Sequence, residues 1–409
     1  MTAPSSPEPA GTAGARPAGP DPGRANLMLF MATLGFMLNF WAWALIGPLG
    51  STYGDELQLS AVQVSAAVAV PVIVGSVGRI PVGALTDRFG ARTMFPVVTM
   101  LTVLPTLFTG LVARNFAMLL IGGFFLGLGG TTFAIGIPFV NRWFPPARRG
   151  MALGIFGMGT VGTAVASFTT VGIADAFGLP APFILVSVLL TIYAVAARSI
   201  IRDAPGLGRP AGSLVARTWA TLKLPSTLEL SLIYAMGFGG FVAFSVYLPT
   251  YLVNAYGLER GDAALRTAGF VVLAVLARPV GGWLSDKFHP IPVLVVNFVV
   301  TGAMALLASA ELALMPLGSI AFLTMGIMLG SAAGACFALV ARVAPPEKVG
   351  SVTGVVGAAG GLGGFFPPLV MGAFYSTTGD YTGGLLLLAA TAFGVAAFTW
   401  WPVRRNAHG

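Results

Sequence analysis

The chain has 409 residues, of which 56% are hydrophobic and only 9% are charged, and its mean hydropathy is +0.87. This composition excludes a soluble globular protein and indicates a membrane protein. The formal net charge is +8, but the basic residues form no cluster with interleaved aromatic residues. We therefore assign this charge to membrane topology and to attraction to the lipid bilayer, and we expect no nucleic-acid partner.

Residues 1–25 are rich in Pro, Ala and Gly and contain no apolar run, which predicts a disordered cytoplasmic tail and not a signal peptide. Twelve apolar windows of about 20 residues follow, each long enough to cross a bilayer as a helix. The predicted spans are 27–49, 61–86, 93–112, 115–141, 149–175, 182–201, 227–254, 263–286, 290–310, 314–342, 348–376 and 383–402.

One long, charged break that contains Pro and Gly interrupts this series at residues 202–226, and we interpret it as a cytoplasmic linker. The expected fold is an all-α membrane protein of twelve transmembrane helices. Its domains are a six-helix half at 26–201, a second six-helix half at 227–402 and a short cytoplasmic tail at 403–409.

Basic residues predict the orientation. With both termini placed in the cytoplasm, the cytoplasmic segments carry 17 Lys or Arg residues and the outer loops carry three. Positive charge is retained on the cytoplasmic side, so this bias predicts a multi-pass protein of the cytoplasmic membrane with both ends inside. The remaining two basic residues, Arg79 and Arg278, lie within apolar spans.

Cysteine and histidine are scarce. The single cysteine, Cys336, and the two scattered histidines, His289 and His408, supply neither a disulfide nor a ligand cluster. We therefore expect no metal and no other cofactor. No nucleophile or acid/base pair is predicted at membrane depth, which argues against a membrane enzyme.

An internal repeat divides the chain. The segment from Arg79 to Phe89 aligns with the segment from Arg278 to Phe288 at an offset of 199 residues. A second set of positions recurs at an offset of 200 residues: Pro145, Pro146, Gly150, Gly154 and Gly157 match Pro345, Pro346, Gly350, Gly354 and Gly357. Two matches at nearly one spacing indicate a duplication, with corresponding spans running in the same direction, as in the two halves of a major facilitator transporter.

The loop after the second span resembles the hallmark loop of the major facilitator superfamily and recurs more loosely in the second half. We expect it to act as a gate, because glycine permits close helix approach and an aspartate can accept hydrogen bonds from helix N-termini. The basic residues of this loop also fit an alternative role, in which the loop ends the helix and holds it on the cytoplasmic side by the positive-inside rule. The gating positions are Gly83, Asp87, Arg88, Gly90, Arg92, Gly282, Asp286 and Lys287.

The two arginines in apolar spans indicate a buried anion. Arg79 lies eight residues before Asp87 and Arg278 lies eight before Asp286, which places each arginine about 12 Å deep, near the middle of the hydrocarbon core. An ionised group there costs at least about 2.5 to 3.5 kcal/mol. All fourteen Asp and Glu residues fall in the tail, loops or helix ends in this assignment, so a structural ion pair is the weaker alternative. The planar guanidinium fork suits a small oxoanion.

The chain after the tail resembles the nitrate/nitrite porter family. That family has an anion-binding arginine in spans two and eight, matched by Arg79 and Arg278, and a glycine-rich signature in spans five and eleven. The resemblance implies aromatic residues that stack on the planar anion. The implied substrate-binding residues are Arg79, Arg278, Phe133, Tyr234, Phe238, Gly159, Thr160 and Gly363.

One position departs from the family. Thr160 stands where the span-five signature has Asn. Threonine keeps one hydrogen-bond donor but lacks the second donor of the amide. This change puts the anion preference in doubt and leaves the anion site intact.

The resemblance implies a monomeric secondary transporter that moves nitrate, nitrite or both by alternating access. The family includes proton symporters and nitrate/nitrite exchangers, and the sequence leaves both open. Two rivals remain: a transporter of another small anion, such as a carboxylate or cyanate, and a membrane sensor that binds the anion without moving it.

Overall fold

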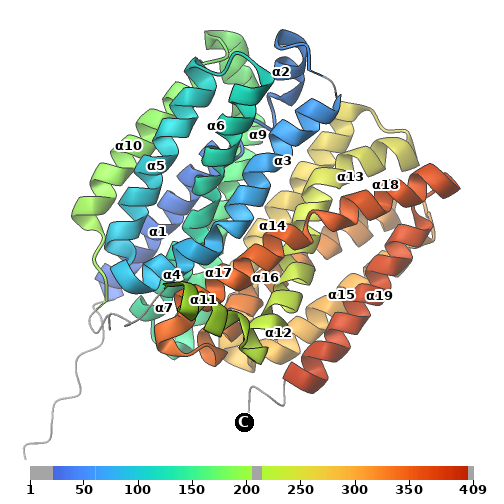
Figure 1. The fold of residues 1–409 in the computed structure, drawn as a ribbon. Coiled ribbons are helices and arrows are strands. Elements are labelled where there is room, and N and C mark those ends of the chain that lie inside the picture. The colour runs from blue at the N-terminus through green and yellow to red at the C-terminus, as the bar shows by residue number, and fades with distance from the viewer. Residues whose placement is uncertain (1–21, 60, 205–213, 404–409) are drawn as a thin grey trace, which may run out of the picture.

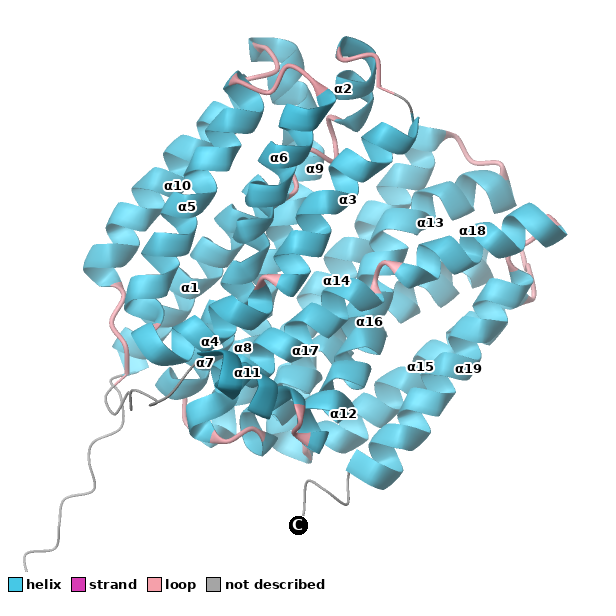
Figure 2. Ribbon diagram, viewed as in Figure 1, coloured by secondary structure: helices cyan, strands magenta, loops and turns pink. Residues whose placement is uncertain are grey.

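The computed structural model describes residues 22–59, 61–204 and 214–403. Within these ranges the chain is helical and contains no strand (Figure 2). Most of the two predicted tails, and part of the predicted linker, lie outside the described residues. The first helix already starts at Pro22, before the predicted start of the first half at residue 26.

The first half is built from long helices that short irregular turns interrupt. Its α-helices are α1 (Pro22–Trp43), α2 (Gly50–Glu56), α3 (Ala61–Val77), α4 (Arg79–Phe89), α5 (Ala91–Leu111), α6 (Phe116–Leu126), α7 (Phe133–Trp143), α8 (Arg149–Gly157), α9 (Val161–Phe177) and α10 (Ala181–Ile200). Three 3₁₀ turns join them: η1 (Gly127–Thr132), η2 (Pro146–Arg148) and η3 (Met158–Thr160).

The second half repeats this plan, after a helix in the predicted linker. The α-helices are α11 (Leu214–Leu222), α12 (Pro225–Tyr234), α13 (Gly240–Tyr256), α14 (Arg260–Phe288), α15 (Pro290–Ser309), α16 (Ser319–Val343), α17 (Val349–Gly363), α18 (Phe366–Thr378) and α19 (Thr382–Phe398). The shorter elements are the π-helical turns η4 (Ala235–Gly239), η5 (Leu314–Gly318) and η7 (Thr399–Val403) and the 3₁₀ turn η6 (Pro346–Lys348).

Twelve segments of the described chain are long and apolar enough to span a membrane, which confirms the predicted number of spans. Most boundaries agree within a few residues. The first span was predicted at 27–49 but runs from Pro22 to Trp43. The predicted span was too long at its end because the apolar residues Leu45 and Ile46 are buried in the turn after the helix. Hydropathy cannot distinguish a buried turn from a helix.

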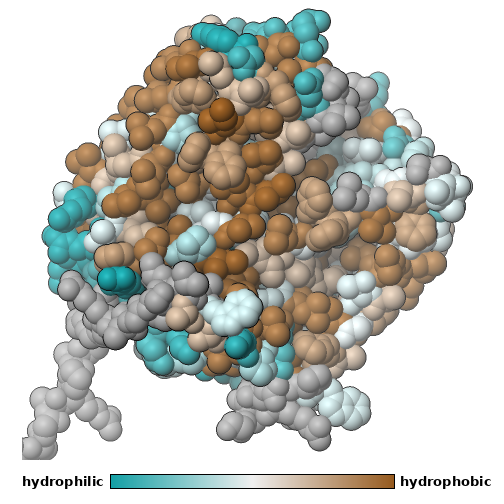
Figure 3. Space-filling view, viewed as in Figure 1, coloured by the Kyte–Doolittle hydropathy of each residue, from teal (hydrophilic) through white to brown (hydrophobic). Residues whose placement is uncertain are grey.

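The two halves lie side by side, and the described chain begins, with α1, and ends, after α19, at the same end of the molecule (Figure 1). We call this end the terminal face. Helix α2 lies at the opposite face. Apolar side chains dominate the middle of the surface shown in Figure 3, and polar ones gather mainly toward its ends, as expected for a molecule surrounded by lipid.

The most extensive contacts between the halves involve four helices, and α3, α7 and α16 add to them. Helix α4 of the first half packs on α17 of the second, and α14 of the second packs on α8 of the first. These are the segments that contain the repeat. The duplicated sequence therefore forms the interface that runs through the centre of the molecule.

Candidate functional site

The two predicted arginines lie at the centre of the interface between the halves. Arg79 starts α4 and Arg278 lies inside α14, and only 1% and 2% of their surfaces are exposed. Arg79 donates from Nη1 to the carbonyl oxygen of Gly357 at 2.7 Å, and Arg278 donates from Nη1 to that of Gly157 at 2.8 Å. Each arginine thus reaches the glycine-rich helix of the other half, and the repeat relates the two contacts.

The two arginines pass the acceptor glycines at different distances. A Cβ atom added to Gly357 would lie 3.1 Å from Cδ of Arg79, a tight contact. One added to Gly157 would lie 3.4 Å from Cδ of Arg278, which is an ordinary van der Waals distance. Bare backbone therefore matters more at Gly357 than at Gly157.

Arg278 keeps two buried donors without a partner among the described residues, Nε and Nη2. Arg79 uses Nε as well, donating to the carbonyl oxygen of Gly130 at 3.1 Å. Neither arginine has a carboxylate within 4.0 Å in the described part of the chain. A buried guanidinium with unused donors and no counter-charge has the chemistry to bind an anion.

The predicted aromatic residues form a column beside the arginines. Tyr234 stacks between Phe133 and Phe238, with ring centroids 6.0 Å and 5.0 Å away and planes inclined by 12° and 3°. The Cζ atoms of Arg79 and Arg278 lie 5.8 Å and 5.3 Å from the ring centroid of Phe238. Phe238 therefore contacts both cations, and Arg79 also lies 5.1 Å from the ring of Phe133.

Two further aromatic residues belong to this cluster and were missed in the sequence. Phe337 of α16 places its edge against Tyr234 and Phe133, at centroid distances of 4.6 Å and 4.9 Å. Phe241 lies 5.1 Å from Cζ of Arg278. Phe241 was detectable because it follows Phe238 by three residues on one helical face. Phe337 comes from a distant span and gave no local signal.

The three remaining predicted binding residues lie in different surroundings. Thr160 is buried and donates from Oγ1 to the carbonyl oxygen of Gly157 at 3.1 Å, the same oxygen that Arg278 contacts. A Cβ atom on Gly159 would meet Phe36, and one on Gly363 would meet Ala235 at 2.9 Å. The structure therefore brings Thr160 to Arg278, whereas the faces of Gly159 and Gly363 pack against other helices.

A cavity of about 690 Å³ leads to this cluster. Phe238, Phe241 and Thr160 line its inner end. The lining continues to Gly47, next to α2, and to Pro249 in the later part of α13. The cavity therefore runs from the ring column toward the opposite face and away from the terminal face.

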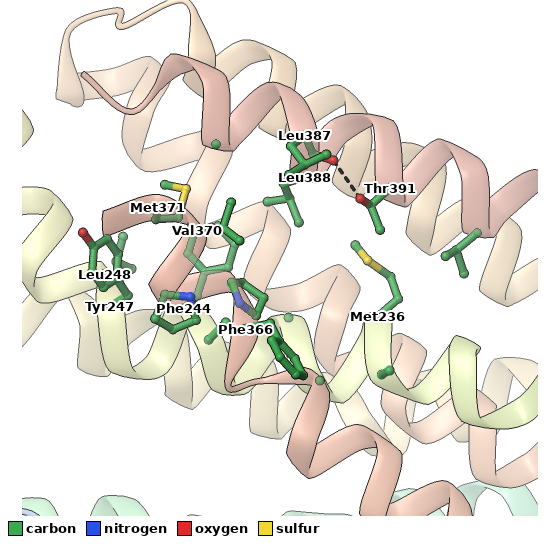
Figure 4. Close-up of a pocket in the computed structure, with 18 of the residues that line it drawn as sticks. Met236, Phe244, Tyr247, Leu248, Phe366, Val370, Met371, Leu387, Leu388 and Thr391 are labelled. Atoms are coloured by element: carbon green, nitrogen blue, oxygen red, sulfur yellow. Dashed lines mark hydrogen bonds between the residues drawn. The ribbon is translucent and has the colours of Figure 1, made fainter. Parts of the chain in front are cut away.

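A second cavity, of about 270 Å³, lies beside α13, α18 and α19 in the second half (Figure 4). Its lining includes Phe244, Phe366 and Leu388 and two labelled residues with hydroxyls, Tyr247 and Thr391. The hydroxyl of Thr391 donates to the carbonyl oxygen of Leu387 at 2.8 Å. Among the described residues, no charged side chain lines it. This cavity is suited to apolar groups, and an anion would lose its hydration there without compensation.

Toward the terminal face, two aspartates cap helices of the other half. Asp87 accepts hydrogen bonds from the backbone N–H groups of Gly350 and Ser351 at 3.0 Å and 2.9 Å, and from Oγ of Ser351 at 2.8 Å. Asp286 accepts from the N–H groups of Gly150 and Met151 at 2.8 Å and 2.9 Å. Each carboxylate lies at a helix N-terminus, where the backbone dipoles favour negative charge. We call this pair of contacts the latch.

Glycine permits the helices of the latch to touch. A Cβ atom on Gly83 would collide with the carbonyl oxygen of Gly350, and one on Gly282 would collide with that of Gly150. Any larger residue would separate the backbones and draw the carboxylates away from the helix ends. The close glycine contacts and the aspartate caps therefore depend on each other.

The other predicted gating residues lie around the latch. Arg88 and Lys287 are exposed, and their charged groups lie 5.4 Å and 5.1 Å from the rings of the adjacent Phe89 and Phe288. Neither side chain forms a hydrogen bond or ion pair across the halves in the described chain.

Gly90 and Arg92 form the turn into α5. Gly90 ends α4 with a φ of +77°, a value that favours glycine. Asp203 accepts from the N–H groups of Ala91 and Arg92 at 2.8 Å and 3.2 Å. Asp203 was missed, because its position after the sixth span carries no sign of the partner.

Comparisons with known proteins agree with this architecture. A family model described as Major Facilitator Superfamily matches residues 32–368 and, in a second match, residues 230–408. The solved structure of the fucose transporter FucP in an outward conformation has a TM-score of 0.72 at 19% identity, covering 91% of this chain and 99% of that chain. The human organic anion transporter MFSD10 has a TM-score of 0.75 at 13% identity, covering 92% and 99%. At these identities the likeness shows the fold alone.

Curated relatives are closer. A probable nitrate/nitrite transporter, NarK2, of Mycobacterium tuberculosis H37Rv is 49% identical over 378 residues, which is 92% of this chain and 95% of the relative. A nitrite extrusion protein of Bacillus subtilis is 36% identical over 390 residues, covering 94% and 97%. The predicted family is thereby confirmed: the chain belongs to the Major Facilitator Superfamily and, within it, to the family of these nitrate/nitrite transporter relatives.

Proposed function

We propose that this secondary transporter carries nitrate, nitrite or both across the cytoplasmic membrane by alternating access, with the anion held between Arg79 and Arg278. The observation that carries this proposal is the pair of buried, unpartnered donors on Arg278, facing the second arginine across the interface. Two cations in a low-dielectric site attract one small anion strongly.

The surroundings of the arginines favour a planar oxoanion. Guanidinium groups can bind two oxygen atoms of one anion in parallel, which a lysine cannot. The ring of Phe238 lies against both guanidinium groups and offers a flat surface to a flat ligand. Tyr234 and Phe133 complete the column and restrict its width.

The latch and the cavity support a particular position in the transport cycle. The cavity leads to the opposite face, while Asp87 and Asp286 hold the terminal face closed. We take the terminal face as cytoplasmic, because the sequence assigns 17 basic residues to that side and three to the other. In this view the structure is open to the outside, and breaking both caps would open it to the cytoplasm.

The glycine runs support movement between these two states. Arg79 and Arg278 contact the glycine-rich helices of the opposite halves, so a rotation of the halves would change both contacts together. In this proposal the transporter acts as a monomer. Proton symport and nitrate/nitrite exchange are the two coupling modes to be separated.

A transporter of another small anion, such as a carboxylate or cyanate, is the second candidate. Thr160 favours it, because its one hydroxyl, in place of the amide of Asn, already donates to Gly157. A sensor that does not transport agrees less well with a latch in both halves.

The proposal is tested with purified protein in liposomes under three conditions. The liposomes contain no substrate anion, or they contain nitrite, or a proton gradient is imposed across their membrane. Uptake of labelled nitrate only with internal nitrite would identify exchange, and uptake driven by the gradient would identify symport. Formate and cyanate serve as competitors. Absence of nitrate and nitrite uptake in all conditions, with formate or cyanate uptake instead, would replace the proposal by the second candidate.

A further inference from the structure

Three buried hydroxyl oxygens lie on two helices next to the ring column and have no hydrogen-bond partner in the described chain. They belong to Thr227 and Ser231 of α12 and to Thr353 of α17. Thr227 and Thr353 are completely buried, with 0% of their surface exposed. A buried hydroxyl without a partner destabilises the conformation that contains it. These three groups therefore fit a function in another conformation better than a role in holding this one together.

Thr353 lies on the face of α17 that contacts the site. It precedes Gly357 by four residues, so the two positions share a face of the helix. A Cβ atom on Gly357 would lie 3.1 Å from Arg79 and 3.4 Å from the ring of Phe133. Thr353 is thus one helical turn from the site, on the side of the latch, since α17 begins at Val349 beside Asp87.

The two hydroxyls of α12 lie between Tyr234 and the start of that helix. Ser231 and Thr227 precede Tyr234 by three and seven residues, which places all three on one face. Helix α12 packs on α17, and a Cβ atom on Gly360 would meet the ring of Tyr234. The hydroxyls of both helices therefore lie between the ring column and the terminal face.

The repeat shows that the fold does not need the hydroxyl of Thr353. At an offset of 200 residues, which Gly150, Gly154 and their partners define, Thr353 corresponds to Leu153. The first half has an apolar residue at this position, so a helix of this kind packs without a polar group there.

We propose that Thr227, Ser231 and Thr353 form a second, transient oxoanion site, which the anion occupies on its way between the arginines and the terminal face once the latch has opened. Each hydroxyl can donate one hydrogen bond to an anion oxygen, and water entering the opened path satisfies the others. The groups that lack partners in the closed state gain them in the open state. This inference rests on the proposed transport function.

The test compares Thr353→Val with Thr170→Val in the complete protein. Thr170 is equally buried, and its Oγ1 also lacks a partner in the described chain, but it lies on α9. For Thr353→Val we expect labelled nitrate uptake about fivefold slower, since the open state loses a hydrogen-bonding group that the closed state does not use. Its melting temperature should be equal or higher, and nitrate affinity at the arginines should be unchanged. Thr170→Val should transport normally.

A variant that combines Thr227→Val, Ser231→Ala and Thr353→Val should transport more slowly still. Normal uptake by this variant, or a fall in the melting temperature of Thr353→Val, would overturn the inference while leaving the proposed function intact. Failure of the wild type to transport either anion would contradict the proposed function itself, and this inference with it.

Discussion

Arg278 and Thr160 share one acceptor, the carbonyl oxygen of Gly157. Nη1 of the arginine donates to it at 2.8 Å and Oγ1 of the threonine donates at 3.1 Å. The residue at position 160 therefore acts on the arginine as well as lining the cavity. This contact gives the departure from the family at position 160 a physical consequence.

Thr160→Asn is expected to shift anion selectivity toward nitrate. The amide offers two donors and a longer reach than the hydroxyl, so it can contact an additional anion oxygen and leave the Gly157 carbonyl to Arg278. The measurement is competition between nitrate and nitrite for uptake, with Thr163→Asn, one turn along the same cavity, as the control. An unchanged ratio of nitrate to nitrite uptake would show that Thr160 does not determine the selectivity of the site.

Asp87→Asn is expected to weaken the latch and to increase the population that is open at the terminal face. The carboxylate accepts three hydrogen bonds from Gly350 and Ser351, and the charged form also interacts with the helix dipole. Loss of the charge should cost the closed state about 1 to 2 kcal/mol. Spin-label distances across the terminal face measure the shift, and Asp262→Asn is a surface control. A distance distribution identical to that of the wild type would exclude a gating role for Asp87.

Gly83→Ala is expected to prevent closure more strongly than the loss of the charge at Asp87. The added methyl group would collide with the backbone of Gly350, which cannot rotate away as a side chain can. Transport should be lost while the protein remains folded. Gly394→Ala on α19 is the matched control, because a Cβ there meets nothing within 4 Å. Transport at the wild-type rate by Gly83→Ala would show that α4 and α17 need not touch.

Phe238→Leu is expected to weaken anion binding about tenfold. The ring contacts both guanidinium groups, and a buried cation–π contact is worth on the order of 1 to 2 kcal/mol. Leucine keeps the position apolar but removes the ring face. Binding of nitrate is measured by isothermal titration, with Phe244→Leu, outside the arginine contacts, as the control. Equal losses of nitrate affinity in the two variants would show that Phe238 acts only through packing.

The sequence predicted the features that obey a period or a repeat. Twelve apolar windows, the duplication and the two arginines at equal depth all follow from local composition and spacing. The repeat also pairs Gly157 with Gly357, which the structure finds in contact with Arg278 and Arg79.

Contacts between distant segments could not be predicted in the same way. Asp87 was expected to accept from a helix N-terminus, but its partner Ser351 lies 264 residues away. Phe337 joins the ring column through tertiary packing, and Asp203 caps α5 from beyond the sixth span. Gly363 belongs to the glycine run, yet its face packs on Ala235 of η4, because a helix presents only part of a run to any one neighbour.

The most direct test of the central claim is labelled nitrate and nitrite uptake into proteoliposomes by the wild type and by Arg278→Lys, measured side by side with Arg266→Lys. Lysine keeps the charge but loses the two donors, Nε and Nη2, that we assign to the anion. The account predicts uptake by the wild type and by Arg266→Lys, whose arginine lies at the surface, and no uptake by folded Arg278→Lys. Near-normal uptake by Arg278→Lys would contradict the assignment of the arginine pair as the anion site.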